Sequence, residues 1–401
     1  MTATAPTPPL HIHLSGTPQE IGRQHGTLLA TQIRRQIVVY EAMFQRTSKL
    51  DWPAVRTVAE TYQATLQRLT PDLYAEMEGI ANGAGLDLRD IVALNCRSEI
   101  ALGLFSDGCS SLGWDCNRYD KGVILAQNWD WTARVKENCV IMTIEQVGKP
   151  KIWMGNEAGL VGKIGFNSAS VGVCMNAIRA KPTDSSKLPF HVAVRLCLNA
   201  TSAAAAIAQL QALGGIASTQ HILIADPTGP VSMELSPLGN VYIRPKGNTG
   251  KDNTGNDNTT KDDTGKDDTG KEDDDEDDFG IVCHTNHLIS NRFVTEYPWL
   301  TGSPVRLARM RMLSAKLAHD VLKAGPKHEV TGDMLRREVF SDTFNAPQAI
   351  CCQEDPARPV ETRSSTLFCF IMRLRPGRKP EAEVVWGRPG SGEEGPVINL
   401  G

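Results

Sequence analysis

The sequence lacks the long apolar run that a membrane-spanning helix needs. None of its 401 residues starts a stretch of roughly 18 or more apolar residues. The beginning, MTATAPTPPLHIHL, has no basic start followed by a continuous apolar core, as a secretory signal would. The end, VINLG, is not a peroxisomal Ser-Lys-Leu address. We therefore expect a cytoplasmic protein with no membrane partner.

The sequence also lacks the cysteine and histidine spacings that hold a metal or a disulfide framework. Ten cysteines are scattered along the chain, and none forms a CxxC pair or a zinc-type cluster. Most lie in apolar runs such as VGVCMNAI and TLFCFIM, where free cysteine behaves as a small hydrophobic residue. The histidines of HTNH, His284 and His287, have no further ligand at suitable spacing. We predict no disulfide framework, no metal, and a structural role for both histidines.

Neither sign of charge dominates the chain, whose net charge is −4. Residues 247–278 contain four lysines and 13 acidic residues, a net charge of −9, so the remainder carries +5. This balance is too mild to indicate a nucleic-acid partner. The same segment is an imperfect Lys-Asp-Asp-Thr-Gly repeat without large apolar residues, and lacks EF-hand spacing. It is predicted to be a disordered acidic surface insertion between the strand-like runs VYIRP and FGIVCHTN.

Residues 17–101 have helical periodicity. Thr17, Pro18 and Glu20 form the start signal of the first helix: a cap hydroxyl, a proline and a glutamate three residues after the cap. Further helices are expected over 52–69, 73–84 and 88–104.

From Cys109 onward the pattern changes to short strand-like runs separated by glycine, proline and asparagine turns. Examples are VILAQNWDW, CVIMTIEQV, HILIADP and STLFCFIMRL. Two helices, over 189–213 and 304–321, interrupt these strands. The pattern predicts an α+β protein with an antiparallel-looking sheet system and helices packed against it.

The stretch SDGCSSLGWDC joins the two parts and suggests sulfur chemistry at Gly108-Cys109. A cysteine thiol can attack the carbonyl carbon of the preceding residue, and hydrolysis of the resulting thioester leaves a new N-terminal cysteine. The glycine at position 108 would help this attack, because a residue without a Cβ can adopt the strained backbone that the attack requires. The freed α-amine, with an ordinary pKa of about 7.7–8.0, would serve as general base for its own thiol.

Several separated motifs resemble the acyl-coenzyme A:6-aminopenicillanic acid acyltransferase family, a group of N-terminal nucleophile hydrolases. They occur in the family's order and cover nearly the whole chain outside the acidic insertion. The matching stretches are GTPQEIGRQHG, LNCRSEIALGL, DGCSS, LAQNWDW, GLVGKIGFNSASVGVCMNA, MELSP, HTNH and TRSSTLF.

The resemblance implies a precursor that cleaves itself between Gly108 and Cys109. Residues 1–108 would then form a helical small (alpha) subunit and residues 109–401 the catalytic large (beta) subunit. The implied fold is a four-layer αββα sandwich whose sheets present the new N-terminus.

The resemblance also assigns roles at the catalytic centre. Asp130 of NWD would orient the cleavage site, and Asn286 of HTNH would hold the oxyanion. Arg363 of TRSSTLF would stabilise charge and pair with Asp130. Without the resemblance, a turn role is the better interpretation of Asp130 and an equally reasonable one for Asn286. Arg363 has two interpretations, an ordinary exposed arginine or, because it precedes an apolar strand, a side chain that points into a cleft.

Three hydroxyl residues match supporting positions of the family. Ser111 corresponds to a hydroxyl needed in the precursor, and Ser236 of MELSP to another functional serine. Thr362 stands where the penicillin enzyme has serine. Three tryptophans have two possible roles, as the lining of an acyl pocket or as ordinary core: Trp114, Trp129 and Trp131.

The predicted function is acyl transfer or amide hydrolysis through a thioester on Cys109. The partners would be a small-molecule acyl donor and an amine acceptor, with no cofactor and with acyl-coenzyme A as a candidate substrate. One alternative is a pure amidohydrolase that acts on N-acyl amino acids or peptides. Another is a non-catalytic scaffold on the same fold, with the acidic repeat as its interaction tail.

Overall fold

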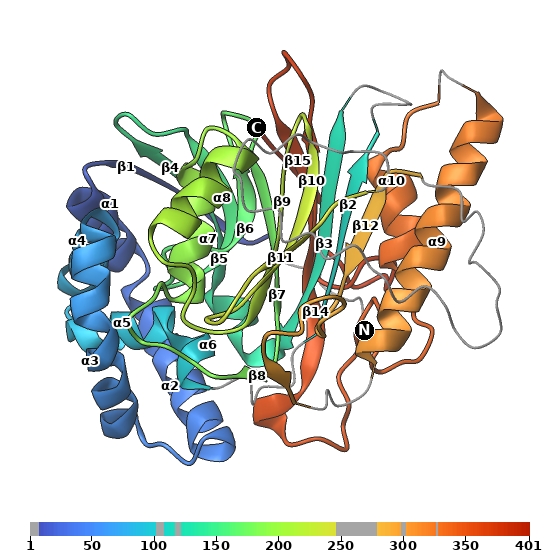
Figure 1. The fold of residues 1–401 in the computed structure, drawn as a ribbon. Helices are drawn as coiled ribbons and strands as arrows, with labels where there is room; N and C mark the ends of the chain where they lie inside the picture. Colours follow the sequence, from blue (N-terminus) through green and yellow to red (C-terminus); the bar gives the residue numbers. More distant parts are fainter. Residues whose placement is uncertain (1–7, 102–107, 117–121, 246–278, 298–301, 326–327) are drawn as a thin grey trace.

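Two large β-sheets lie between two layers of helices (Figure 1). The structure, a computed structural model, describes residues 8–101, 108–116, 122–245, 279–297, 302–325 and 328–401. Helices α1 to α8 lie on the side of the eight-stranded sheet, and α9 and α10 lie beside the six-stranded sheet. The predicted mixed α+β class is confirmed.

The N-terminal part is helical from residue 18 to residue 100, as predicted. Its helices are α1 Pro18–Leu28, α2 Ala30–Thr47, α3 Trp52–Leu69, α4 Pro71–Ala84, α5 Leu88–Asn95 and α6 Arg97–Ile100. The expected capping box is present: Glu20 N donates to Thr17 Oγ1, and Thr17 N donates to Glu20 Oε2. The single helix expected over 88–104 is instead α5 and α6, with a break at Cys96, and residues 102–104 lie outside the described chain.

The eight-stranded sheet has the order β1-β4-β5-β6-β7-β9-β10-β11. Its strands are β1 Leu10–Gly16, β4 Cys139–Gln146, β5 Ile152–Glu157, β6 Ile164–Asn167, β7 Gly172–Ala177, β9 Gln220–Asp226, β10 Gly229–Leu235 and β11 Val241–Ile243. All neighbours are antiparallel except β1 and β4, which run parallel. Strand β1 was not predicted from the sequence; its Ile12 and Leu14 are buried while their neighbours are more exposed.

The six-stranded sheet has the order β12-β2-β3-β14-β15-β16. Its strands are β12 Ile281–His284, β2 Gly108–Asp115, β3 Val123–Thr132, β14 Ser364–Leu374, β15 Glu381–Trp386 and β16 Val397–Leu400. A short pair, β8 Ala180–Lys181 and β13 Thr295–Glu296, lies apart. The two large sheets pack closely: a Cβ on Gly113 of β2 would lie 2.7 Å from Pro230 Cβ of β10.

The later helices differ in detail from the prediction. The helix expected over 189–213 is two helices, α7 Phe190–Asn199 and α8 Ala203–Ala212, because Ser202 caps a new start by accepting from Ala205 N. Helix α9 spans Ser303–Ala324. The remaining helical segments are α10 Gly332–Leu335, η1 Ala133–Asn138, η2 Arg336–Phe340 and η3 Val360–Thr362.

The acidic segment 247–278 lies outside the described residues. The strands that flank it, β11 and β12, belong to different sheets. Within the described part of the chain, no helix combines the length and apolar character that crossing a membrane demands.

Candidate functional site

Cys109 lies at the start of β2 and faces the space between the two sheets. Residues 109, 111 and 113 share one face of this strand because side chains alternate along it. On that face Ser111 contacts Asn176 of β7 and Gly113 approaches Pro230 of β10. Cys109 is buried, at 2% exposure. The thiol therefore belongs to the interior face of the sheet and not to the outer surface.

Gly108 has no room for a side chain. It pairs with Asp130 across β2 and β3, and a Cβ on Gly108 would lie only 2.6 Å from Asp130 Oδ2. Gly108 is not among the glycines with positive φ. The reason for glycine thus differs from the strained backbone expected from the sequence: here it permits the close approach of a carboxylate.

The backbone of Cys109 is held on both sides by buried polar side chains. Its N–H donates to Asn286 Oδ1 over 2.8 Å. Its carbonyl oxygen accepts from Arg306 Nη1 over 2.6 Å, and Arg306 Nη2 donates to the same Asn286 Oδ1 over 2.8 Å. All three residues are at most 3% exposed. Cys109, Asn286 and Arg306 therefore form one closed cluster, the Cys109 clamp.

Arg306 was missed by the sequence analysis. It lies on the buried stripe of α9 together with Leu307, Met310 and Leu317. An arginine on the apolar face of an amphipathic helix is the signal that was available, because such a charge needs buried partners.

Asn286 is oriented by contacts on each side. Its backbone N–H donates to Ser303 Oγ over 2.8 Å, and its Nδ2 donates to Ala177 O over 3.1 Å. The amide oxygen, not the amide nitrogen, is thus directed at the Cys109 backbone. Asn286 lies at Cys109 as expected, with Nδ2 on a backbone carbonyl at the end of β7.

Asp130 is fully buried on β3 and accepts from Thr366 Oγ1 of β14 over 2.6 Å. It lies beside Gly108, on the opposite face of the sheet from Cys109 and its register partner Trp129. Burial, followed by the negative charge of Asp130, raises the pKa of the nearby Cys352 thiol well above its ordinary value. Asp130 therefore adjoins the bond before Cys109 and favours neutral thiols around it.

Arg363 occupies a different position from the one expected. Its guanidinium donates to the backbone carbonyls of Arg358 and Pro356 over 2.7 and 2.8 Å. These contacts replace the expected ion pair with Asp130, because Arg363 follows the η3 turn and folds back on it. Thr362, in the same turn, donates to Pro359 O.

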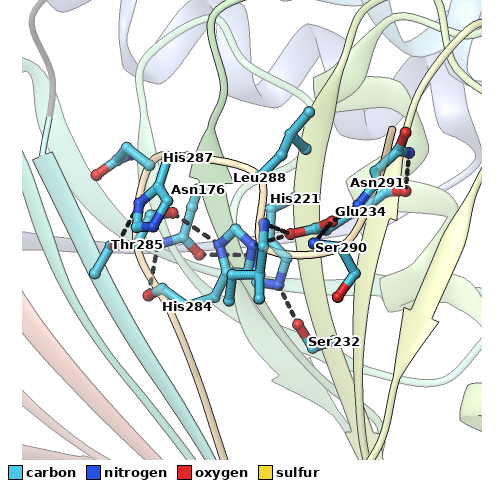
Figure 2. Close-up of polar contacts among 12 residues, drawn as sticks. Asn176, His221, Ser232, Glu234, His284, Thr285, His287, Leu288, Ser290 and Asn291 are labelled. Carbon is cyan, nitrogen blue, oxygen red and sulfur yellow. Dashed lines mark hydrogen bonds and ion pairs between the residues drawn. The ribbon is translucent and has the colours of Figure 1, made fainter. Parts of the chain in front are cut away.

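The two predicted serines hold their surroundings by hydrogen bonds. Ser111 Oγ donates to Asn176 Oδ1 over 2.8 Å. Asn176 in turn belongs to a buried network of polar groups that includes His221 and Ser232 (Figure 2). Ser236 lies further away, in a turn after β10, where its hydroxyl donates to Gly239 O over 2.6 Å. Ser111 is thus two residues from the thiol, whereas Ser236 shapes a loop.

The three tryptophans and His284 are buried, and His287 is half-buried. Trp129 and Trp131 pack in the core between the sheets, and Trp114 packs on the other face, in the cluster that includes Met310 and Leu317 of α9. His284 pairs with Glu234, and His287 contacts Ser303. In the portion of the chain that the structure describes, no three His, Cys, Asp or Glu residues are grouped to hold a metal ion.

A buried charged cluster, also missed from the sequence, adjoins Trp129. Glu157 accepts from Arg97 Nη2 over 2.7 Å, from Lys163 Nζ over 2.9 Å and from Tyr40 OH over 2.7 Å. Burial alone would raise the pKa of Glu157, but Arg97 and Lys163 lower it more, to about 2. The Lys163 ammonium lies 3.5 Å from the centre of the Trp129 ring, which neighbours Cys109 across the β2–β3 ladder.

Two comparisons with known proteins indicate the same family. Residues 117–389 match the family model described as acyl-coenzyme A:6-aminopenicillanic acid acyl-transferase. The chain is 34% identical over 393 residues to the acyl-coenzyme A:6-aminopenicillanic-acid-acyltransferase 40 kDa form of Emericella nidulans, covering 96% of this chain and 94% of that protein. It also matches the penicillin V acylase structure from Agrobacterium tumefaciens at 14% identity and a TM-score of 0.35, over 73% of this chain and 90% of that one. From the family model and the extended match to the Emericella protein, the chain belongs to the acyl-coenzyme A:6-aminopenicillanic acid acyltransferase family.

Proposed function

We propose that this protein is a self-processing acyltransferase with Cys109 as its N-terminal nucleophile. The observation that carries the proposal is the Cys109 clamp, in which Asn286 and Arg306 hold the backbone atoms of Cys109 from both sides. An enzyme whose base is its own α-amine must keep that amine fixed after the chain is cut. The clamp supplies such a fixed position.

The first step is an intramolecular acyl shift. The Cys109 thiol attacks the carbonyl carbon of Gly108, the C–N bond breaks, and the departing amine takes the thiol proton. Water then hydrolyses the thioester, which gives a Gly108 carboxylate and a free Cys109 thiol with an α-amine. Asp130 lies against Gly108 and restricts its conformation, so its proposed role is to hold the scissile peptide in place.

In turnover, the α-amine takes the proton of the Cys109 thiol while the sulfur attacks the carbonyl carbon of an acyl donor. The leaving thiol or amine departs with that proton, and the acyl group remains on sulfur as a thioester. An acceptor amine then attacks the thioester to complete transfer, or water attacks to complete hydrolysis. Asn286 Oδ1 holds the α-amine, and Asn286 Nδ2 is the proposed oxyanion donor once it leaves Ala177 O.

The proposed substrates follow from the family. An acyl-coenzyme A or amide serves as donor and an amine such as a 6-aminopenicillanate serves as acceptor, as the name of the Emericella relative suggests. Arg363 is placed on a turn and is therefore proposed to act at the edge of the site, with Thr362 beside it. Ser111 and Ser236 are proposed to support processing through the strand and the loop that they hold.

The proposed subunits are residues 1–108 and 109–401, in an αββα N-terminal nucleophile hydrolase fold. The two layers of helices around the two sheets support this assignment. The pieces would remain associated because β1, which precedes the cut, is paired along its whole length with β4, which follows it.

The test is the mass and N-terminal sequence of purified protein. We expect two fragments, the larger beginning at Cys109, and a single uncut chain for Cys109→Ala. An active wild-type protein that consists of one unbroken chain would contradict the proposal.

A second assay separates transfer from hydrolysis. Processed enzyme is given an acyl-coenzyme A with and without an amine acceptor, and free acid and acylated amine are quantified. Formation of the acylated amine supports the transferase, whereas acid alone at all amine concentrations indicates the amidohydrolase alternative. Neither product from fully processed protein would support the scaffold alternative.

A further inference from the structure

Glu234 and His284 form a buried pair in the interior between the sheets (Figure 2). Glu234 lies on β10 and His284 on β12, so each of the two large sheets contributes one residue. His284 Nε2 lies 2.9 Å from Glu234 Oε1, and both side chains are 0% exposed. The His221 ring is stacked on the His284 ring with centres 3.5 Å apart.

Hydrogen-bond partners determine which of these groups carry protons. His284 Nδ1 faces Thr285 O and Nε2 faces the Glu234 carboxylate, and both acceptors lack hydrogens. Both ring nitrogens of His284 are therefore held by acceptors. Burial, followed by the charge of His284, lowers the pKa of His221 well below its ordinary value. The neutral His221 ring is thus stacked on the ring that is paired with the Glu234 carboxylate.

Glu234 also fixes the loop that follows His284. Its carboxylate accepts the backbone N–H groups of Ile289, Ser290 and Asn291 over 2.5, 3.0 and 2.6 Å. Hydrogen bonds of this kind favour the ionised form, and the pKa of Glu234 is lowered although burial opposes the change. One carboxylate therefore joins the last residue of β12 to the far end of the loop.

The near end of the same loop is attached to α9. Thr285 Oγ1 donates to Ser303 O, Asn286 N donates to Ser303 Oγ, and His287 Nδ1 lies 2.7 Å from that hydroxyl. Asn286 therefore lies between two anchors, Ser303 on one side and Glu234 on the other.

The network also reaches the strand that carries the nucleophile. Asn176 Oδ1 accepts from Ser111 Oγ and from His221 Nδ1, each over 2.8 Å, and His221 Nε2 lies 2.9 Å from Ser232 Oγ. Because the amide oxygen accepts, His221 carries its hydrogen on Nδ1, which leaves Nε2 as an acceptor for Ser232.

We infer that Glu234, paired with His284, is a positioning residue that sets the place of Asn286 at the Cys109 backbone. This inference rests on the proposed function, since it concerns processing and turnover at Cys109. Within the MELSP motif, Glu234 is therefore the residue that connects the motif to Asn286 and the Cys109 clamp. Ser236 has a lesser part, because it shapes the turn whose Gly239 carbonyl accepts from Asn291.

The test compares Glu234→Gln with a matched control, Glu76→Gln. Glu76 and Arg195 also form a buried ion pair, at 1% and 0% exposure, but in the helical layer between α4 and α7. We expect Glu234→Gln to slow conversion of precursor and kcat by roughly 10- to 100-fold with little change in KM. Glu76→Gln should lower the melting temperature and leave conversion and kcat near the wild-type values below that temperature.

A double-mutant cycle with Asn286→Ala distinguishes positioning from a general loss of structure. If Glu234 acts through Asn286, Glu234→Gln/Asn286→Ala will convert no more slowly than Asn286→Ala alone. The inference would be overturned if the two substitutions slowed conversion independently, so that their effects multiply in the double variant. It would also be overturned if Glu234→Gln converted at the same rate as Glu76→Gln. If Glu234→Gln does not accumulate as folded protein, Glu234→Asp, which keeps the charge on a shorter side chain, replaces it in the same cycle. Wild-type protein that is never cut at Cys109 overturns the proposed function instead, so the two failures are distinguishable.

Discussion

Arg306 and Cys109 donate to one shared acceptor, the side-chain oxygen of Asn286, each over 2.8 Å. The cation also holds the carbonyl oxygen of Cys109. Cutting the chain before Cys109 would leave these contacts in place, because they involve atoms on the retained side of the bond. The site is thus arranged to keep its new end where it was formed.

Replacement of Arg306 tests this arrangement. Arg306→Met removes the donors and retains an apolar stem, so three buried acceptors, Cys109 O, Ser110 Oγ and Asn286 Oδ1, lose a charged partner at a cost of about 1–3 kcal/mol. We expect precursor conversion, followed as band intensity over time, to slow by roughly 10- to 100-fold. Arg306→Lys should convert at a rate between those of the wild type and Arg306→Met, because a single ammonium replaces a guanidinium that donates from two nitrogens. Arg309, on the same helix, pairs with Asp342 beyond η2, and Arg309→Met, which breaks this pair, is the control. Normal conversion of Arg306→Met would contradict the role of the clamp.

The contact between Gly108 and Asp130 makes alanine unfavourable at position 108. A Cβ there would lie 2.6 Å from Asp130 Oδ2, so strand or carboxylate must move, at a cost of about 1–3 kcal/mol. We expect Gly108→Ala to lower the free energy of unfolding of the precursor and to slow its conversion. Gly395→Ala is the matched control, because the nearest atom to its added Cβ is 3.5 Å away. Equal free energies of unfolding for the two variants would show that strand β2 accommodates the added Cβ without cost.

Neutralising Glu157 should be strongly destabilising. Glu157→Gln leaves the cations of Arg97 and Lys163 buried without their carboxylate, and breaking such a pair costs about 3–5 kcal/mol. The pKa of about 2 lies below the ordinary 4.5, so the wild-type carboxylate contributes stability above pH 4.5 and loses it as the pH falls toward 2. In urea unfolding between pH 3 and 7, the free energy of unfolding should fall less on acidification in the variant than in the wild type. If the free energy of unfolding depended on pH identically in the two proteins, Glu157 would not be the group responsible for the acid sensitivity.

His25 should make the fold sensitive to acid at a higher pH. The neutral ring accepts from Gly159 N at Nε2 over 2.9 Å, and burial, followed by Arg195, lowers its pKa from 6.5 to about 3. Below pH 6.5 the unfolded chain therefore binds a proton at His25 that the folded chain does not bind. The free energy of unfolding consequently falls as the pH decreases from 6.5 toward 3. His25→Gln, which keeps an acceptor without a titration, should flatten the unfolding free energy over this range. An unchanged slope would assign the acid loss to other groups.

Local patterns predicted many of the elements. The capping signal of Thr17 and Glu20 and the short strand-like runs of β9 and β14 are short-range features, and the structure has them where they were expected. The split of the helix over 189–213 was missed because apolar periodicity continues across Ala200–Ser202, and only the cap of Ser202 marks the break.

Sequence motifs pointed to Cys109 and Asn286 as candidate site residues, but they did not reveal the contacts between them. Cys109 and Asn286 meet although 177 positions separate them. Arg306, Glu157 and Glu234 were not identified, since their partners lie 6 to 197 positions away and no spacing rule connects them. Arg363 was assigned to Asp130 by resemblance, while its guanidinium satisfies carbonyls of its own turn.

By itself, the sequence determined where helices give way to strands, which cysteine follows a glycine at that point, and which family the motifs resemble. These properties are encoded by neighbouring residues, whose periodicity and turn chemistry act over a few positions. Only the tertiary structure decided which face Cys109 presents, which side chains hold its backbone and which buried charges pair. A buried charge is tolerated only beside a partner, and partners come from strands and helices that meet solely when the two sheets pack together.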